Sequence, residues 1–115
     1  MNWLAHSRWR PILYAFGPIA IACSIGVAAE GDANAGKVKT RMCAGCHGIS
    51  DYRVAYPEVY AVPRLGGQDE SYIAKALRDY RSGARKHLSM QGMAASLTDQ
   101  DIKDIAAYYA QGGTK

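Results

Sequence analysis

Residues 43 to 47 read Cys43-Ala44-Gly45-Cys46-His47, two cysteines that are separated by two residues and followed directly by a histidine. This spacing is typical of a covalent haem attachment site, in which each thiol bonds a vinyl group of the macrocycle. Two intervening residues allow one helical turn, so both sulfur atoms reach the same edge of the macrocycle while the imidazole points at its centre. The motif predicts one haem c, bonded to Cys43 and Cys46, with His47 as an axial ligand of the iron.

Two other uses of paired cysteines agree less well with the rest of the chain. A thioredoxin-like redox pair needs alternating strands and helices around it, and the sequence shows no such pattern. A structural zinc site needs four ligands, and beyond residue 29 the only further cysteine or histidine is His87. Metal or thiol chemistry at the two cysteines is therefore the alternative to haem.

The first 29 residues have the pattern of a targeting segment. Basic residues precede an apolar run over residues 12–27, and small residues follow, which offers a cleavage point after Ala29. We predict a signal peptide over residues 1–29, export to the periplasm, and one domain over residues 30–115. Two alternatives stay open: an uncleaved anchor, because the run is close to the length of a membrane span, and lipidation of Cys23.

The exported domain is expected to contain three main helices and no strand. Asp32 is the predicted cap of a first helix that continues into the haem motif. Asp69 caps a second helix over residues 70–82, whose apolar stripe is expected to be core, and Thr98 caps a third. Residues 48–62 show neither the helical period of 3.6 residues nor the strand period of two, and are expected to be an irregular loop. The fold class is all-α.

Residues 85–93 are expected to form a loop that carries three candidate iron ligands, His87, Met90 and Met93. A thioether is a weak donor that suits haem iron and raises its reduction potential. A methionine more often packs in a core, so the chemistry alone leaves the second axial ligand open among the three.

A turn with proline and paired glycines over residues 62–67 is a candidate neighbour of the haem. A ligating histidine usually donates its second ring N–H to a carbonyl or a similar acceptor. The carbonyl of Pro63 is our candidate for this acceptor.

Together these pieces resemble a class I cytochrome c, closest to the small bacterial kind represented by one half of a cytochrome c4. The matching stretches stand in the family's order: Cys43-Ala44-Gly45-Cys46-His47, Pro63-Arg64-Leu65-Gly66-Gly67-Gln68, Met90-Gln91-Gly92-Met93, Leu97-Thr98-Asp99-Gln100-Asp101-Ile102 and Ala106-Ala107-Tyr108-Tyr109. A cytochrome c4 carries two haems on about twice this length, whereas one motif permits one haem.

The resemblance implies the cytochrome c fold, with helices wrapped around one covalent haem. It implies that Met90, seven residues before Leu97, is the second axial ligand. It further implies that Pro63 accepts a hydrogen bond from His47 and that Leu65 packs on the haem. The first helix would cross the last at Gly36.

With both axial positions filled, no open iron site remains, so the resemblance implies an electron carrier of a respiratory chain and not an enzyme. The expected partners are redox proteins: a donor such as a quinol-cytochrome c reductase or a dehydrogenase, and an acceptor such as a terminal oxidase. We expect no nucleic acid partner, and membrane contact only through partners or an uncleaved leader. One alternative is a cytochrome subunit of a periplasmic dehydrogenase complex, and another is a haem sensor with an open axial position.

The formal net charge of the chain is +4. Two basic clusters lead into the parts of the chain expected at the haem. Lys37, Lys39 and Arg41 precede the attachment motif, and Arg81, Arg85 and Lys86 lead into the segment over residues 85–93 that carries the methionines. Such clusters can steer an acidic redox partner toward the haem edge, and a solvated surface without a partner is the alternative. Tyr80, Arg81 and Arg85 are also candidates for a position near a haem propionate.

Overall fold

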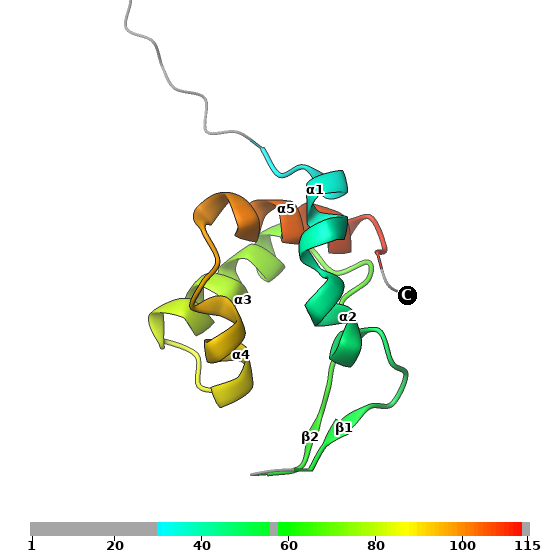
Figure 1. Cartoon of the computed structure of the whole chain (residues 1–115), viewed down its shortest axis with the longest axis vertical. Helices are drawn as coiled ribbons and strands as arrows, with labels where there is room; N and C mark the ends of the chain where they lie inside the picture. The colour runs from blue at the N-terminus through cyan, green and yellow to red at the C-terminus, as the bar shows by residue number, and fades with distance from the viewer. Residues whose placement is uncertain (1–29, 56–57, 114–115) are drawn as a thin grey trace, which may run out of the picture.

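The computed structural model describes residues 30–55 and 58–113, in which short connecting segments and one hairpin link the helices (Figure 1). In this part of the chain the elements are α1 (Ala33–Lys39), α2 (Arg41–His47), β1 (Arg53–Val54), β2 (Tyr60–Ala61), α3 (Glu70–Ser82), α4 (Leu88–Ala94) and α5 (Asp99–Ala110). Within it, no helix combines the length and apolar character needed to cross a membrane. The predicted signal peptide lies outside the described residues.

The helices α3 and α5 begin where the sequence predicts. The side chain of Asp69 accepts a hydrogen bond from the backbone N–H of Tyr72 at 2.9 Å, which caps α3. This helix ends at Gly83, whose φ of 80° lies in the left-handed region that glycine adopts without a steric cost. At α5, Thr98 and Asp101 form a capping box, each side chain bonding the backbone N–H of the other.

The predicted first helix is divided into two. Asp32 caps α1 as expected, accepting from the N–H of Asn34 at 2.8 Å. The division falls at Thr40, which is buried and whose hydroxyl donates to the carbonyl of Lys37 at 3.2 Å. A threonine hydroxyl that bonds a carbonyl of the preceding turn tends to bend a helix. The prediction of one continuous helix was therefore wrong at this residue.

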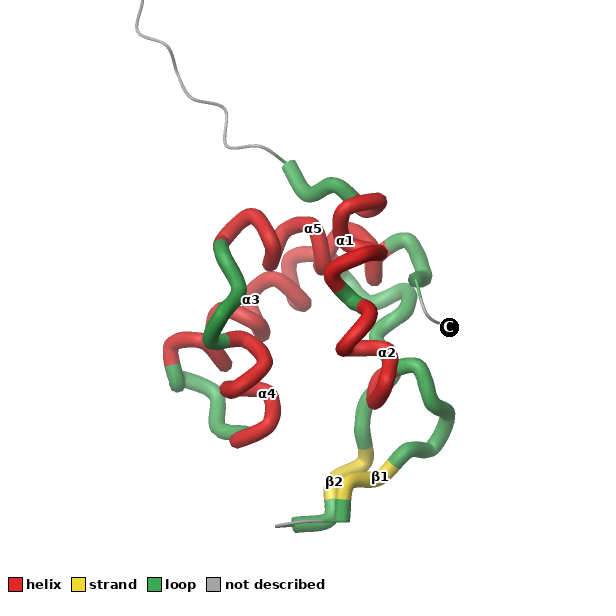
Figure 2. The backbone as a smooth tube through the Cα atoms, viewed as in Figure 1, coloured by secondary structure: helices red, strands yellow, loops and turns green. Residues whose placement is uncertain are grey.

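The prediction of no strand was wrong at one place in the described chain. β1 and β2 pair antiparallel, with Arg53 opposite Ala61 and Val54 opposite Tyr60. Figure 2 shows the pair as a hairpin that extends away from the helices. Two-residue strands are too short to produce an alternating pattern, which is why residues 48–62 read as an irregular loop.

The methionine segment was predicted as a loop and instead contains α4. The ring of His87 caps this helix, with Nδ1 accepting from the N–H of Met90 at 3.4 Å. Histidine is not among the residues that usually mark a helix start. A seven-residue helix is also too short for a convincing 3.6-residue period.

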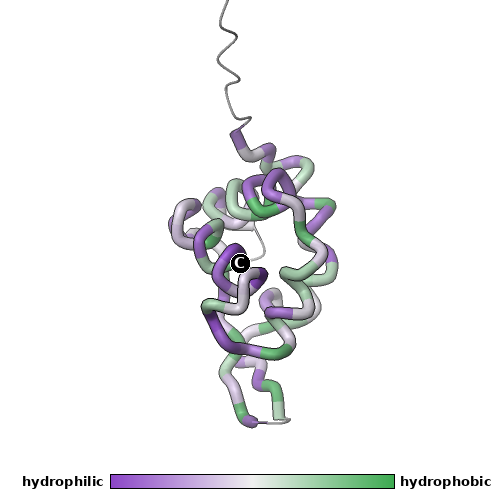
Figure 3. The backbone as a smooth tube through the Cα atoms, turned by 90° about the vertical axis from the view of Figure 1, so that its left-hand side faces the viewer, coloured by the Kyte–Doolittle hydropathy of each residue, from purple (hydrophilic) through white to green (hydrophobic). Residues whose placement is uncertain are grey.

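The core is formed mainly where α3 packs on α5 (Figure 2). Its buried members are Ile73, Ala74, Ile102, Ile105, Ala106 and Tyr109. Hydrophobic and hydrophilic residues are interleaved along the helices (Figure 3), as expected for helices with one buried face. The stripe of α3 is only partly core, however, because Tyr72 is 50% exposed.

The helix α1 crosses α5 at Gly36, as the family resemblance implies. A Cβ at Gly36 would lie 2.0 Å from the carbonyl oxygen of Asp104 and 2.8 Å from the Cβ of Tyr108. Only a residue without a side chain permits this approach. The close contact brings the chain leading into the haem motif against the C-terminal helix.

A buried carboxylate joins the same two helices. Asp104 is 3% exposed and accepts hydrogen bonds from Lys39 Nζ at 2.6 Å, Gln100 Nε2 at 2.8 Å and the backbone N–H of Asp32 at 2.9 Å. The bond from the Lys39 ammonium is the main cause that holds the pKa of Asp104 below its usual value, followed by the Asp32 N–H and opposed by burial. The buried charge is thus paired and hydrogen-bonded.

Candidate haem site

The attachment motif forms most of α2. Cys43 and Cys46 stand three residues apart in this helix, a spacing that places two side chains on one helical face. Cys43 is half-buried against the core and Cys46 is exposed. Both thiols are therefore on one side of α2, with the second open to an approaching group.

His47 ends α2 and its ring is held in one orientation. The residue is 8% exposed, and Nδ1–H donates to the carbonyl oxygen of Pro63 at 2.6 Å. This bond leaves Nε2 as the nitrogen with a free lone pair, which is the arrangement of a metal-bound imidazole. The predicted hydrogen bond is present, whereas the roles of His47 and Pro63 toward haem stay predictions.

The turn that supplies the Pro63 carbonyl is anchored to α5. The N–H of Gly67 donates to the carbonyl of Tyr109 at 2.8 Å, and the N–H of Gln68 donates to that of Leu65 at 3.1 Å. Leu65 is half-buried and packs against the core cluster. The C-terminal helix thereby holds the segment that orients the histidine. Packing of Leu65 on the haem stays a prediction.

Tyr109 is a site residue whose role the sequence did not reveal. It is fully buried in the core cluster against which Cys43 packs. Burial raises the pKa of the Cys43 thiol, and the nearby Tyr109 side chain opposes this only in part. The apolar stripe of α5 placed Tyr109 in the core, but nothing local showed that the core reaches the first cysteine.

The methionine side of the candidate site lies on α4, which packs on α3. Met90 and Met93 are both half-buried. His87 is occupied as the helix cap, and its ring lies 4.8 Å from that of Tyr60 and 6.5 Å from that of Tyr80, measured between centroids. The histidine therefore serves packing and capping in this structure, which leaves the two methionines as thioether candidates.

α2 and α4 lie on opposite sides of the structure and do not touch one another (Figure 1). An imidazole whose Nδ1 is bonded to a carbonyl, two thiols on one helical face and an opposite helix with two methionines form a set that fits a covalently attached haem. No group of three or more His, Cys, Asp or Glu side chains that could hold a metal ion occurs within residues 30–55 and 58–113. The alternative of a four-ligand zinc site finds no support there.

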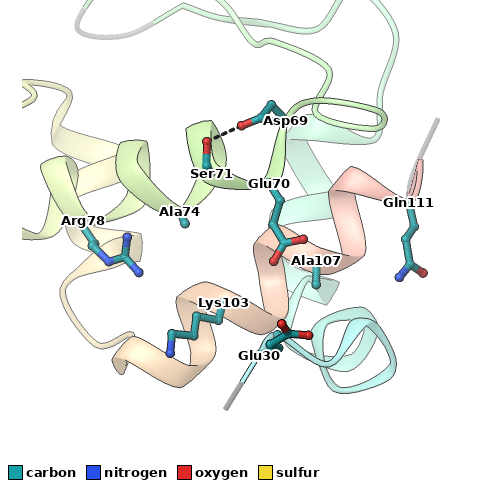
Figure 4. Close-up of a pocket in the computed structure, with 10 residues that line it drawn as sticks. Glu30, Asp69, Glu70, Ser71, Ala74, Arg78, Lys103, Ala107 and Gln111 are labelled. Atoms are coloured by element: carbon teal, nitrogen blue, oxygen red, sulfur yellow. Dashed lines mark hydrogen bonds between the residues drawn. The ribbon is translucent and has the colours of Figure 1, made fainter. Parts of the chain in front are cut away.

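A separate hollow of about 720 Å³ lies beside α3 and α5 (Figure 4). Its lining carries both signs of charge, with carboxylates from Glu30 and Glu70 and cationic groups from Arg78 and Lys103. None of the predicted haem residues lines it. The hollow is distinct from the candidate haem site.

The helix order and the attachment motif define a c-type haem protein. Residues 33–112 match the family model described as cytochrome c, and the chain belongs to this family. Family membership implies a covalently attached haem c, for which Cys43 and Cys46 are the attachment residues. The recognition made from the sequence, together with the cytochrome c fold and its mostly helical class, is confirmed.

Curated relatives include a cytochrome c4 from Pseudomonas aeruginosa, 44% identical over 71% of this chain and 39% of the relative. A cytochrome c-554(548) from Halomonas halodenitrificans is 42% identical over 70% of this chain and 95% of the relative. A thiosulfate dehydrogenase electron acceptor from Stutzerimonas stutzeri is 43% identical over 56% of this chain and 29% of the relative.

Among solved structures, reduced recombinant cytochrome c4 from Pseudomonas stutzeri superposes with a TM-score of 0.58 at 41% identity, over 71% of this chain and 46% of that one. The chain spans about two fifths of the length of the curated cytochromes c4 that it matches. The similarity therefore covers less than half of each of these cytochromes c4.

Proposed function

We propose that this chain is a periplasmic electron carrier that holds one haem c between His47 and Met90 and passes single electrons between redox proteins. The observation that carries the proposal is the pairing of His47 with Pro63 at the end of the attachment helix. A bound haem supplies a one-electron couple, and the protein sets its potential through the axial ligands, burial and hydrogen bonds around them. A site closed on both faces has no room for substrate, which fits a carrier and not an enzyme.

Different residues of the chain would hold the two faces of the haem. On one face the Pro63 carbonyl orients His47 and increases the basicity of its outer nitrogen. On the other face α4 holds Met90 at the end of a capped first turn. Cys43 and Cys46 would bond the haem covalently and so attach it to α2.

The direct test is an absorption spectrum of protein that matured in a periplasm, oxidised and reduced, for wild type, Met90→Ala and Met93→Ala. We expect a c-type spectrum in all three and loss of the thioether-to-iron band in Met90→Ala alone. Loss of the band only in Met93→Ala would reassign the ligand. Absence of a haem spectrum from properly exported wild type would refute the proposal.

Two members of the basic clusters are paired with carboxylates of this chain, so fewer cationic groups are available to steer a partner than the sequence suggests. Lys39 bonds Asp101 and Asp104 at 2.6 Å each, and Arg81 bonds Asp99. Lys37, Arg41 and Lys86 are exposed and stay candidates for contact with an acidic donor or acceptor. Electron transfer with the natural partner should slow as salt rises, and a salt-independent rate would refute steering.

A second candidate is a cytochrome that accepts electrons from a dehydrogenase as part of its complex. The similarity to a protein named thiosulfate dehydrogenase electron acceptor favours it. Co-purification from the native host distinguishes the two: a stable stoichiometric partner with its own cofactor supports the complex, and its absence supports a free carrier. Binding of carbon monoxide by the native ferrous protein would instead favour a sensor.

The proposed location depends on residues 1–29, which we propose to be a signal peptide cleaved after Ala29. Intact mass of the exported protein tests this. A mass that includes residues 1–29 would indicate a retained anchor, and a lipid adduct on Cys23 would indicate a lipoprotein.

A further inference from the structure

Arg81, in the last turn of α3, makes two hydrogen bonds to the start of α5. Its Nη1 donates to the carbonyl oxygen of Leu97 at 2.8 Å, and its Nη2 donates to Asp99 Oδ1 at 2.5 Å. Leu97 is half-buried against the core cluster. The guanidinium therefore connects a helix end to a point that is itself anchored in the core.

The segment between these two points carries the methionine helix. Residues 83–96 leave α3, form α4 and return to α5 (Figure 1). Arg81 stands just before this segment and Leu97 just after it. One side chain thus joins the two ends of the segment, and joining the ends of a chain segment reduces the conformations it can adopt.

We propose that Arg81 is a positioning residue for Met90. Its bond to the Leu97 carbonyl would hold the two ends of residues 83–96 together and so keep the Met90 thioether in place as an iron ligand. The inference rests on the proposed His47/Met90 site. Loss of the bond lets residues 83–96 open more often without unfolding the α1–α5 and α3–α5 contacts. Arg81 is thereby engaged within the protein.

The two bonds of Arg81 are not equivalent. The bond to Leu97 is partly buried and has a charged donor, and such bonds are about twice as strong as neutral ones. The bond to Asp99 reaches a side chain that is 74% exposed, where ion pairs contribute little. The carbonyl bond is therefore the one expected to hold the segment.

Neighbouring arginines do not duplicate this contact. The guanidinium of Arg85 lies 4.8 Å from the centre of the Tyr80 ring and donates to the Tyr72 hydroxyl at 3.5 Å. Arg78, one turn earlier in α3, lines the hollow beside α5. Arg78 therefore serves as a matched control on the same helix.

The test compares haem-loaded wild type with Arg81→Met, Arg81→Lys, Asp99→Asn and Arg78→Met. The first measurement is the rate at which imidazole binds the ferric protein, which requires the thioether to leave. The second is hydrogen exchange of residues 83–96. A charge-assisted hydrogen bond changes an equilibrium by about tenfold, so Arg81→Met should bind imidazole about tenfold faster and exchange faster in this segment only.

The other variants distinguish the carbonyl bond from the ion pair. Asp99→Asn and Arg78→Met should stay within about twofold of wild type. Arg81→Lys should lie between wild type and Arg81→Met, because an ammonium lacks the planar fork that reaches both acceptors. If Arg81→Met does not fold, a wild-type rate and wild-type exchange in Arg81→Lys refute the proposal.

Failure of the clamp, meaning the bond from Arg81 to the Leu97 carbonyl, and failure of the Met90 assignment give different results. If Met90→Ala keeps the thioether band, the ligand assignment is wrong, and exchange of residues 83–96 still tests the clamp. Equal exchange in Arg81→Met and Arg78→Met refutes the clamp whichever residue binds the iron.

Discussion

Replacing Gly36 with alanine tests the helix crossing on which the fold depends. The added Cβ would lie 2.0 Å from the Asp104 carbonyl oxygen and 2.8 Å from the Tyr108 Cβ, so α1 and α5 must move apart. Overpacking of this kind costs about 3 kcal/mol at the upper end of its usual range. Alanine returns about 1 kcal/mol through its higher helix propensity. We expect a net loss of about 2 kcal/mol in the free energy of unfolding.

The same movement weakens the bonds that Asp104 accepts across this crossing, so the loss should not fall below that figure. Guanidinium denaturation of the haem-loaded protein, followed by far-ultraviolet circular dichroism, measures the loss as a lower midpoint at unchanged slope.

A matched substitution separates the clash from the change in helix propensity. Gly92 lies inside α4, and a Cβ there meets no atom within 4 Å. Gly92→Ala should therefore keep the stability of wild type or gain up to about 1 kcal/mol. A Gly36→Ala protein as stable as wild type would show that α1 does not press on α5 as described, and would refute the reasoning.

Three further predictions concern buried charge, capping and acid. Asp104→Asn should lower the free energy of unfolding at pH 7 by about 2 kcal/mol, because the Lys39 ammonium loses its buried partner, as chemical denaturation would show. The folded pKa of Asp104 is depressed, so its contribution is present above the unfolded pKa near 4 and is lost as the pH falls through the folded value. The difference between wild type and Asp104→Asn should therefore shrink below about pH 4, and a difference that grows there would contradict the pairing. Thr98→Ala should cost about 1 kcal/mol through loss of the capping box, and an unchanged thermal midpoint would argue against it.

Several features could be predicted from the sequence because their signals are local. The caps Asp69 and Thr98 mark the starts of α3 and α5, since a short polar side chain bonds an N–H two or three residues away. The attachment motif is likewise a local pattern, in which the spacing alone places two thiols and an imidazole on one helix. The acceptor for His47 was also predicted, from general ligand chemistry and the turn at Pro63.

Other features depend on residues far apart in the chain. The sequence showed Lys39 and Arg81 as members of two basic clusters, yet each is engaged by α5 or by the chain leading into it. Asp104 interrupts the apolar stripe of α5, which was the only local sign of a buried network. The α4 helix and the hairpin escaped prediction because both are too short for a periodic pattern.

The sequence by itself determined the chemistry of this protein: a covalent haem c on Cys43 and Cys46, a helical domain around it and membership of the cytochrome c family. The tertiary structure decided how the two faces of the site are supported. It brought α5 against α1 at Gly36 and Tyr109 against Cys43, and joined the ends of the methionine segment through Arg81. The physical reason is that a cap or a motif acts within one turn, whereas packing and buried pairs form only when distant segments meet.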